Sequence, residues 1–282
     1  MGGDYYVHNI DPILFQIGPI AIRWYALSYI AGILIGWRYA MTLAAKAPRL
    51  VTPEDIDAFM VWAVVGIILG GRLGQVIFYH PGYYLDNPSE ILQIWKGGMA
   101  FHGGLLGVIV AMLLFCRNRK LSLFGFTDLI ALVAPIGIGL GRIANFINGE
   151  HWGRVSDVSW AVIFSSTGGG PVQRHPSQLY EAAMEGALLF LLLAVLVHVG
   201  RALWRPGLTT GTFLMGYAVA RTVGELFREP EVLAGTLPFG TTWGQWLSLP
   251  MALYGAYLIY KAMKSPRATE KPERDNSAGN TA

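Results

Sequence analysis

Long apolar blocks separated by short polar segments dominate the pattern along the chain. Each block approaches the roughly 20 residues that a helix needs to cross the hydrocarbon core of a bilayer. Glycine, arginine and asparagine interrupt the second and fourth blocks without ending them. We therefore expect an all-α polytopic membrane protein with about seven transmembrane helices, near 19–42, 57–79, 99–116, 127–148, 181–203, 210–227 and 241–263.

Composition agrees with this class of protein. Of the 282 residues, 53% are hydrophobic and 14% are charged, whereas a soluble domain carries about 25% charged residues. The net charge of +3 is too small to indicate a nucleic-acid partner, and one cysteine, Cys116, excludes an internal disulfide framework. Histidine and acidic residues are scattered, and no GxSxG, HExxH or Walker motif occurs. We expect no metal and no cofactor.

The basic residues of the loops predict the orientation, because Lys and Arg are enriched in cytoplasmic loops. Four of them, Lys96, Arg154, Arg174 and Arg228, lie on one side. The N-terminus is therefore expected outside and the C-terminus in the cytoplasm, on the side that holds Arg38, Lys46, Arg49, Arg117, Arg119, Lys120, Arg201, Arg205, Lys261, Lys264, Arg267, Lys271 and Arg274.

A single integral membrane domain is expected over residues 1–263. The segment from about 150 to 180 is too long for a tight turn and predicts a small extracytoplasmic head. Residues 264–282 contain no apolar run and predict a disordered cytoplasmic tail. The N-terminus lacks the basic region and cleavage site of a signal peptide, so the first block is expected to remain as a span.

Polar side chains gather within the fourth predicted span, in GLGRIANFINGEHWGR, residues 139–154. A charge near the bilayer centre costs about 2.5–3.5 kcal/mol on insertion scales, so such residues usually have a function or a partner. On a helix, Arg142 and Asn145 share a face, with Asn148 and Glu150 at its external end. The planar fork of arginine suits a phosphate. The alternative is a polar network that only holds helices together.

The sixth predicted span holds a second group, in GYAVARTVGELFREP, residues 216–230. Tyr217, Arg221, Glu225 and Arg228 are spaced 4, 4 and 3 apart, which predicts one helix face. Glu225 can pair with either arginine. The stripe is either a structural ion-pair row or a cationic lining for an anionic lipid head group.

Glycine-rich and helix-start segments supply the remaining candidates. In MAFHGGLLG, residues 99–107, His102 begins a span and could act as a general base, or could be structural. Gly66, Gly70 and Gly74 have helix-packing spacing, and so do Gly137 and Gly141. HPSQLYEA, residues 175–182, predicts a helix start at which Glu181 has a capping role.

These motifs together resemble one known family. GRIANFINGEHWGR closely resembles GRxGNFxNxExxGR, the signature of the prolipoprotein diacylglyceryl transferases. HGGLLG, HPSQLYEA, the stripe of the sixth span with Glu229-Pro230, and DPILFQIGPIAIRWYAL at the N-terminus also look like that family, in the same order. The resemblance covers residues 8–263. Ala144 stands where the family usually has glycine, and His151 where an apolar residue is common.

The resemblance implies an enzyme of the bacterial inner membrane. It implies phosphatidylglycerol as the lipid donor and, as acceptor, the lipobox cysteine of a prolipoprotein signal peptide. The products would be a thioether-linked diacylglyceryl protein and glycerol 1-phosphate, formed without metal or nucleotide. Catalytic roles would fall to His102, Arg142 and Arg221, and substrate-binding roles to Tyr25, Arg142, Asn145, Glu150, Gly153, Tyr217, Arg221, Glu225 and Arg228.

Such a reaction requires a thiolate, because the thiolate is the nucleophile. His102 could remove the thiol proton, or the arginines could favour the thiolate directly. A transporter for an organic anion or lipid, with an arginine-lined path, is the alternative function. The polar groups gather toward the external half of the predicted spans, which favours a pocket open on one side over a path open on both.

Overall fold

The structure, a computed structural model, describes residues 5–46, 48–230 and 241–270. Contacts within the chain divide it into two compact units. The first contains the described residues up to Tyr39 together with Asp128–Ala268, and the second contains Ala40–Thr127. Every predicted site residue except His102 belongs to the first unit. The predicted tail beyond residue 270 lies outside the described residues.

A helix lies at each of the seven predicted positions. Helix α2 continues into a π-helical segment, η1, and α6 continues through the π-helical η5 into α7. The helices are α1 (Trp24–Ala44), α2 (Pro53–Gly74), η1 (Gln75–Tyr79), α3 (Pro81–Asp86), η2 (Pro88–Leu92), η3 (Ile94–Lys96), α4 (Phe101–Arg119), α5 (Leu123–Asn148), η4 (Ser165–Thr167), α6 (Ser177–Glu181), η5 (Ala182–Leu188), α7 (Leu189–His198), η6 (Ala202–Trp204), α8 (Leu208–Gly224) and α9 (Trp243–Lys264).

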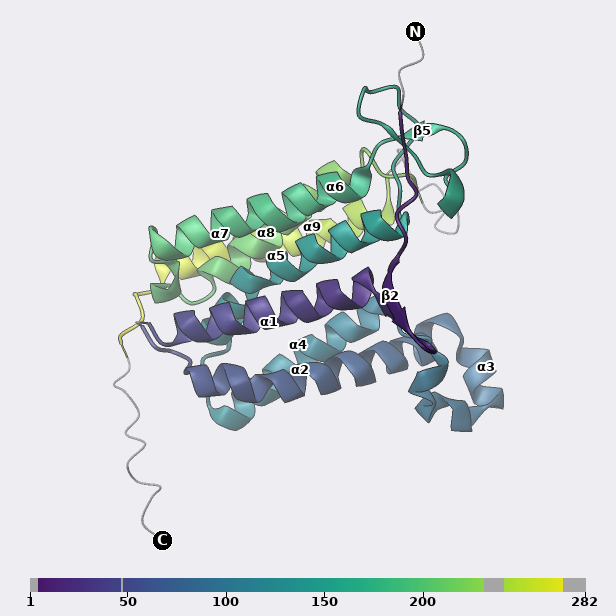
Figure 1. Cartoon of the computed structure of the whole chain (residues 1–282). Coiled ribbons are helices and arrows are strands. Elements are labelled where there is room, and N and C mark those ends of the chain that lie inside the picture. The colour runs from purple at the N-terminus through teal and green to yellow at the C-terminus, as the bar shows by residue number, and fades with distance from the viewer. Residues whose placement is uncertain (1–4, 47, 231–240, 271–282) are drawn as a thin grey trace. The chain divides into compact units, whose positions relative to one another are not determined.

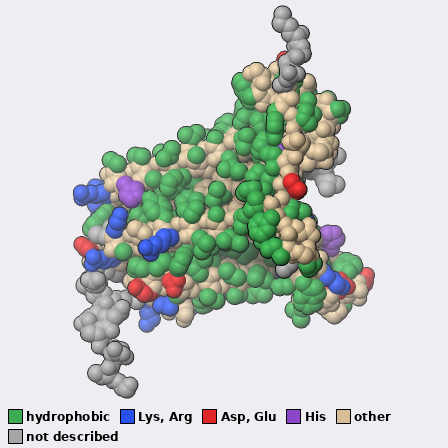
Figure 2. All heavy atoms as spheres, in the orientation of Figure 1, with side chains coloured by type: hydrophobic (Ala, Val, Ile, Leu, Met, Phe, Trp, Pro, Cys, Tyr) green, Lys and Arg blue, Asp and Glu red, His purple; other side chains and the backbone are tan. Residues whose placement is uncertain are grey.

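Five helices of the described chain are long and apolar enough to cross a membrane, and they make the protein a polytopic membrane protein. They are Trp24–Ala44, Pro53–Tyr79, Phe101–Arg119, Leu123–Asn148 and Ser177–His198. Apolar side chains cover the helices on the face seen in Figure 2. Helices α8 and α9 occupy the other two predicted positions without meeting the same criteria of length and hydropathy. Seven spans therefore stays a prediction, as does the orientation.

Short strands accompany the helices of the first unit, which the all-α prediction did not include. Strand β1 (Tyr6–Val7) pairs in parallel with β4 (Val162–Ile163), and β5 (Gln173–Arg174) pairs antiparallel with β4. Strands β2 (Ile13–Ile17) and β3 (Ile20–Arg23) form a hairpin directly before α1 (Figure 1). The N-terminal strand thus joins the segment predicted to form a head.

Glycines hold α2 and α4 of the second unit in direct backbone contact. A Cβ atom added to Gly70 would lie 2.3 Å from the carbonyl oxygen of Gly103, and one added to Gly107 would lie 2.0 Å from that of Gly66. Only hydrogen fits at either position, which confirms the packing role predicted for Gly66, Gly70 and Gly74. In the first unit, a Cβ on Gly32 would lie 2.9 Å from the Cα of Gly137, which confirms close packing there. A Cβ on Gly141 would meet nothing within 4 Å, so the packing role predicted for Gly141 is wrong. His102 is the second residue of α4.

The second unit also buries an arginine, Arg72 of α2, whose partners are carbonyl oxygens. Its Nε donates to Ile91 at 2.8 Å and its Nη1 donates to Gly97 at 2.6 Å. The Tyr84 ring lies 5.1 Å from the guanidinium carbon. Arg72 satisfies polar backbone groups of the connection between α3 and α4, and this explains how the unit accommodates its charge.

Two features position the helices of the first unit: a close backbone contact between α5 and η5, and a buried carboxylate at the start of α8. A Cβ on Gly186 of η5 would lie 2.6 Å from the Cα of Gly139, so α5 and η5 touch backbone to backbone. The fully buried Asp128 carboxylate of α5 accepts the Gly207 N–H at 2.8 Å and the Thr210 N–H at 2.7 Å. These donors are the N-cap residue and the third residue of α8, where a carboxylate also complements the helix dipole.

Candidate functional site: a buried cluster of arginine and glutamate

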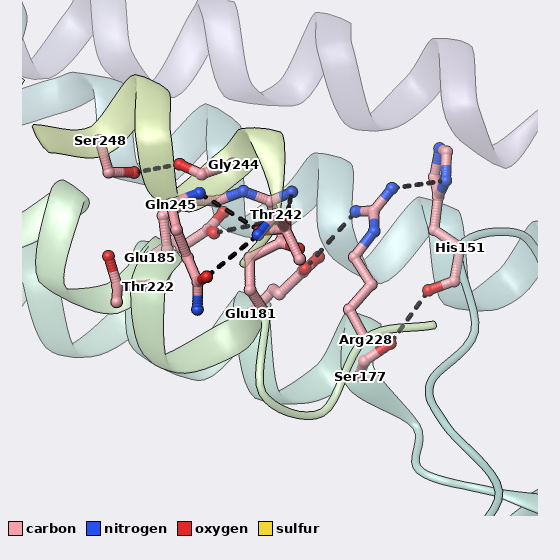
Figure 3. A network of polar contacts seen from close by, with 12 residues as sticks. His151, Ser177, Glu181, Glu185, Thr222, Arg228, Thr242, Gly244, Gln245 and Ser248 are labelled. Atoms are coloured by element: carbon pink, nitrogen blue, oxygen red, sulfur yellow. Dashed lines mark hydrogen bonds and ion pairs between the residues drawn. The ribbon is translucent and has the colours of Figure 1, made fainter. Parts of the chain in front are cut away.

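Side chains from three parts of the first unit meet in one ionic cluster. Figure 3 labels Glu181, Glu185 and Arg228 of this cluster. Arg142 comes from α5, Arg221 from α8 and Arg228 from the turn that follows α8. Glu181 is the last residue of α6, and the remaining two carboxylates are Glu185 of η5 and Glu225, directly after α8. Sequence analysis predicted four of these six residues as site residues.

Arg142 contacts two glutamates through its whole guanidinium. Its Nη1 lies 2.9 Å from Glu181 Oε2, and its Nε and Nη2 each lie 3.0 Å from Glu185 Oε2. The backbone contact between Gly139 and Gly186 explains this proximity, because each glycine lies within one turn of a member of the pair. Charge-assisted bonds of this kind fix the plane of a guanidinium as well as its position.

Arg221 pairs with two further oxygens of the cluster. Its Nη1 lies 2.8 Å from Glu181 Oε1, and its Nη2 pairs with Glu225, four residues along the chain. Gly244, in the first turn of α9, packs against this pair, because a Cβ there would lie 2.6 Å from Glu225 Oε1. Helix α9 therefore covers Arg221 and Glu225 at backbone distance.

Arg228 reaches the cluster from outside the helix. Its Nη2 lies 2.9 Å from His151 Nδ1, and its Nη1 lies 3.5 Å from Glu181 Oε1. Helix α8 ends at Gly224. The prediction of one continuous helix face from Tyr217 to Arg228 is therefore wrong for Arg228, because the chain turns before it. The turn instead aims Arg228 back toward Glu181.

Burial differs between the two kinds of side chain. Arg142 and Arg221 keep 17% and 16% of their side-chain surface exposed, whereas Glu181 and Glu185 keep none. The accessible part of the cluster is thus mainly arginine, with carboxylates beneath it. Three arginines and three glutamates also balance in formal charge. Removing one partner from such a buried group costs about 3–5 kcal/mol, since it leaves an uncompensated charge.

A second polar group lies around Glu150, at the end of α5. Asn145 and Asn148 donate their side-chain amides to Glu150 Oε1, at 2.7 Å and 3.2 Å. Gln178 donates to the Glu150 carbonyl at 2.7 Å. Asn145 and Glu150, both predicted site residues, are therefore brought together.

The two predicted tyrosines have different surroundings. The Tyr25 hydroxyl lies 3.0 Å from that of Tyr29 on the next turn of α1, and Tyr25 is within electrostatic range of Glu150 and Arg142. Tyr217 lies on α8 within range of Glu185 and both helical arginines. Tyr25 is thus within electrostatic range of both polar groups, and Tyr217 is within range of the ionic cluster.

Gly153 acts through its backbone. Its N–H donates to the His175 carbonyl at 2.9 Å, and it forms a bridge with Arg228. A Cβ at this position would lie 2.5 Å from the His175 oxygen and 2.6 Å from the Phe227 oxygen. Only glycine allows this crossing of three chain segments, which holds the turn that carries Arg228.

Two residues of the cluster were missed. The capping role predicted for Glu181 is wrong, because its carboxylate pairs with arginines that lie 39 and 40 residues away. Glu185 was not singled out. The available signal was two acidic residues, four apart, within an otherwise apolar block. His102 belongs to the second unit, and its role stays a prediction.

The apolar helices and the buried ionic cluster define a multi-pass membrane protein with a polar site among its helices. Residues 12–261 match the family described as prolipoprotein diacylglyceryl transferase. The chain belongs to this family, and is therefore a transferase of lipoprotein biosynthesis.

Similar proteins support the same assignment. A phosphatidylglycerol–prolipoprotein diacylglyceryl transferase of Azospirillum brasilense is 54% identical over 263 residues, covering 92% of this chain and 97% of the relative. That of Paramagnetospirillum magneticum is 54% identical over 257 residues, covering 91% and 95%. That of Nitrobacter winogradskyi is 47% identical over 279 residues, covering 96% and 95%. The transporter hypothesis finds no support in these relatives.

Proposed function

We propose that the chain transfers the diacylglyceryl group of phosphatidylglycerol to the lipobox cysteine of a prolipoprotein, and that the arginine cluster holds the lipid phosphate. The cysteine sulfur forms a bond to the terminal glyceryl carbon, and the bond from that carbon to the phosphate oxygen breaks. The thiol proton leaves, and glycerol 1-phosphate takes the electron pair of the broken bond. The single observation that supports this most is the convergence of Arg142, Arg221 and Arg228 on Glu181, with the side chains of Arg142 and Arg221 partly exposed.

The leaving group gains negative charge as the bond to carbon breaks. Guanidiniums already fixed by buried carboxylates need little reorganisation to stabilise that charge. Arg142 and Arg221 are anchored by Glu185 and Glu225 respectively, and both by Glu181. We assign Arg142 and Arg221 to the phosphate, and Arg228 to its outer edge.

Asn145, Glu150, Tyr25 and Tyr217 would orient the glycerol and phosphate groups. Amide, carboxylate and hydroxyl groups supply both the donors and the acceptors that a glycerol head group requires. The pairing of Asn145 with Glu150 supports a shared role, because each fixes the orientation of the other.

Thiolate formation has two candidate causes. His102, at the start of α4, would take the thiol proton directly or through water. Alternatively, the arginines would favour the thiolate by their charge. Near-normal turnover of His102→Ala at raised pH would favour the arginines.

Both substrates lie in the membrane. Phosphatidylglycerol would enter sideways between helices, and the signal helix of the prolipoprotein would hold its cysteine near the same depth. This proposal includes seven spans in the bacterial inner membrane, with the N-terminus and a small head, near residues 150–180, outside. The segment of that head contains the crossing at Gly153, which supports a role beside the site.

A direct assay tests the function. The purified full chain is incubated with labelled phosphatidylglycerol and a peptide that contains a lipobox cysteine. We expect the peptide to gain the mass of one diacylglyceryl group on its cysteine, with one glycerol 1-phosphate released for each transfer. A cysteine-to-serine peptide is the control. Absence of the mass gain with a folded enzyme would refute the proposal.

A further inference from the structure

Glu181 occupies the centre of the cluster rather than its edge. Of the carboxylates that the structure describes, it alone forms ion pairs with all three arginines: Oε2 with Arg142 at 2.9 Å, and Oε1 with Arg221 at 2.8 Å and Arg228 at 3.5 Å. Glu185 contacts two of the arginines and Glu225 contacts one.

The three arginines come from two segments that are distant along the chain. Arg142 belongs to α5, Arg221 to α8, and Arg228 to the turn after α8. Like charges repel one another, so a shared counter-charge is needed to hold them at one place. Glu181 provides this charge, and each of its oxygens lies within ion-pair distance of at least one arginine.

The surrounding backbone fixes Glu181 in turn. It ends α6 where the chain becomes the π-helix η5, and π-helical turns inside helices are frequent at functional sites. Gly224 at the end of α8 packs against its side chain, since a Cβ there would lie 3.4 Å from Glu181 Cγ. The side chain has no exposed surface.

We infer that Glu181 is a positioning residue for the transfer reaction: it holds the guanidiniums of Arg142 and Arg221 in the arrangement that receives a phosphodiester. This inference rests on the proposed function. Glu181 acts through the arginines and does not itself contact the lipid, because it is fully buried beneath them.

Glu181→Gln tests the inference, since glutamine keeps the volume of the side chain and removes its charge. The cluster then changes from balanced to a net charge of +1. A positive site attracts the anionic lipid at least as strongly, so KM for phosphatidylglycerol should stay the same or fall. Turnover should fall about 100-fold, as expected when reacting groups are displaced by about 1 Å. Glu181→Asp keeps the charge on a shorter side chain, and should recover part of the turnover.

Asp128→Asn is the matched control. Asp128 is an equally buried carboxylate of the same unit, but its partners are backbone and hydroxyl groups of residues 207 and 210. Its replacement should lower the thermal unfolding temperature without changing turnover per folded molecule. Folded protein is measured for every variant by size-exclusion chromatography and thermal unfolding.

Several outcomes would overturn the inference. Wild-type turnover by Glu181→Gln would overturn it. A fall in activity that is fully accounted for by a smaller amount of folded protein would also overturn it. A raised KM with unchanged turnover per folded molecule would also contradict it. If the wild-type enzyme gave no mass gain on the lipobox peptide, the proposed function would fail first, and the inference with it.

Discussion

Replacing Arg142 by lysine preserves the charge of the cluster but removes the planar guanidinium that contacts two glutamates. Arg142 places three nitrogens on two carboxylates, at 2.9, 3.0 and 3.0 Å. A lysine ammonium is a single point of charge and cannot span Glu181 and Glu185 in this plane. Since the formal charge stays balanced, we expect the protein to fold.

The magnitude of the effect follows from the lost donors. Removing one preorganised donor to a developing negative charge lowers turnover by about 10²–10³, or roughly 2.7–4 kcal/mol. Arg142→Lys should therefore transfer at least about 100-fold more slowly than wild type, with a smaller change in KM.

The assay measures diacylglyceryl transfer to a lipobox peptide at matched amounts of folded protein. Arg119→Lys is the control, because Arg119 is 44% exposed and its pair with Asp55 is 3.5 Å long. Asp55 itself is buried, but lysine keeps the positive charge beside it and neither residue belongs to the ionic cluster, so turnover should not change. Wild-type turnover by Arg142→Lys would refute the assignment of its guanidinium to the phosphate.

Two glycine substitutions test the packing around the sites. Gly107→Ala should lower the stability of the protein by about 1–3 kcal/mol, because the new methyl would lie 2.0 Å from the Gly66 oxygen. Thermal unfolding in detergent measures the loss. Gly104→Ala is the control, because its methyl would lie at an ordinary 3.6 Å from its nearest neighbour. Gly244→Ala should reduce the rate of diacylglyceryl transfer at least tenfold, or by about 1.4 kcal/mol, because the new methyl would displace Glu225 and Arg221. Gly141→Ala should leave the rate unchanged, because its methyl would meet nothing within 4 Å. Equal stability of the Gly107 and Gly104 variants, or equal transfer rates of the Gly244 and Gly141 variants, would contradict these contacts.

The positions of the helices could be predicted from sequence because membrane spans leave a local signal. Apolar runs of near-constant length indicated a helix at each of the seven predicted places, and five of these helices in the described chain are long and apolar enough to cross a membrane. Helix packing was also readable where it depends on one residue type, as at Gly66 and Gly70. The short strands left no such signal, because β1 pairs with a segment about 150 residues away.

Four of the six cluster residues could be predicted from the sequence, and the other two could not, because their partners are distant along the chain. Arg142 and Arg221 stand out because charge is costly in an apolar block. Their partner Glu181 lies at a helix start, where acidic residues are common for another reason, the helix dipole. The one local signal is Glu185, a second acidic residue four positions along in an apolar block, and it does not reveal that the partners of Glu181 are arginines 39 and 40 residues away. The π-helix that follows it has no sequence signature that separates it from an α-helix.

The most direct test of the whole account is an experimental structure of the chain with phosphatidylglycerol bound. We expect the phosphate oxygens within hydrogen-bonding distance, about 2.7–3.2 Å, of nitrogens from both Arg142 and Arg221, with Glu181 still beneath them. A phosphate bound elsewhere, with the ionic cluster closed and untouched, would contradict the account.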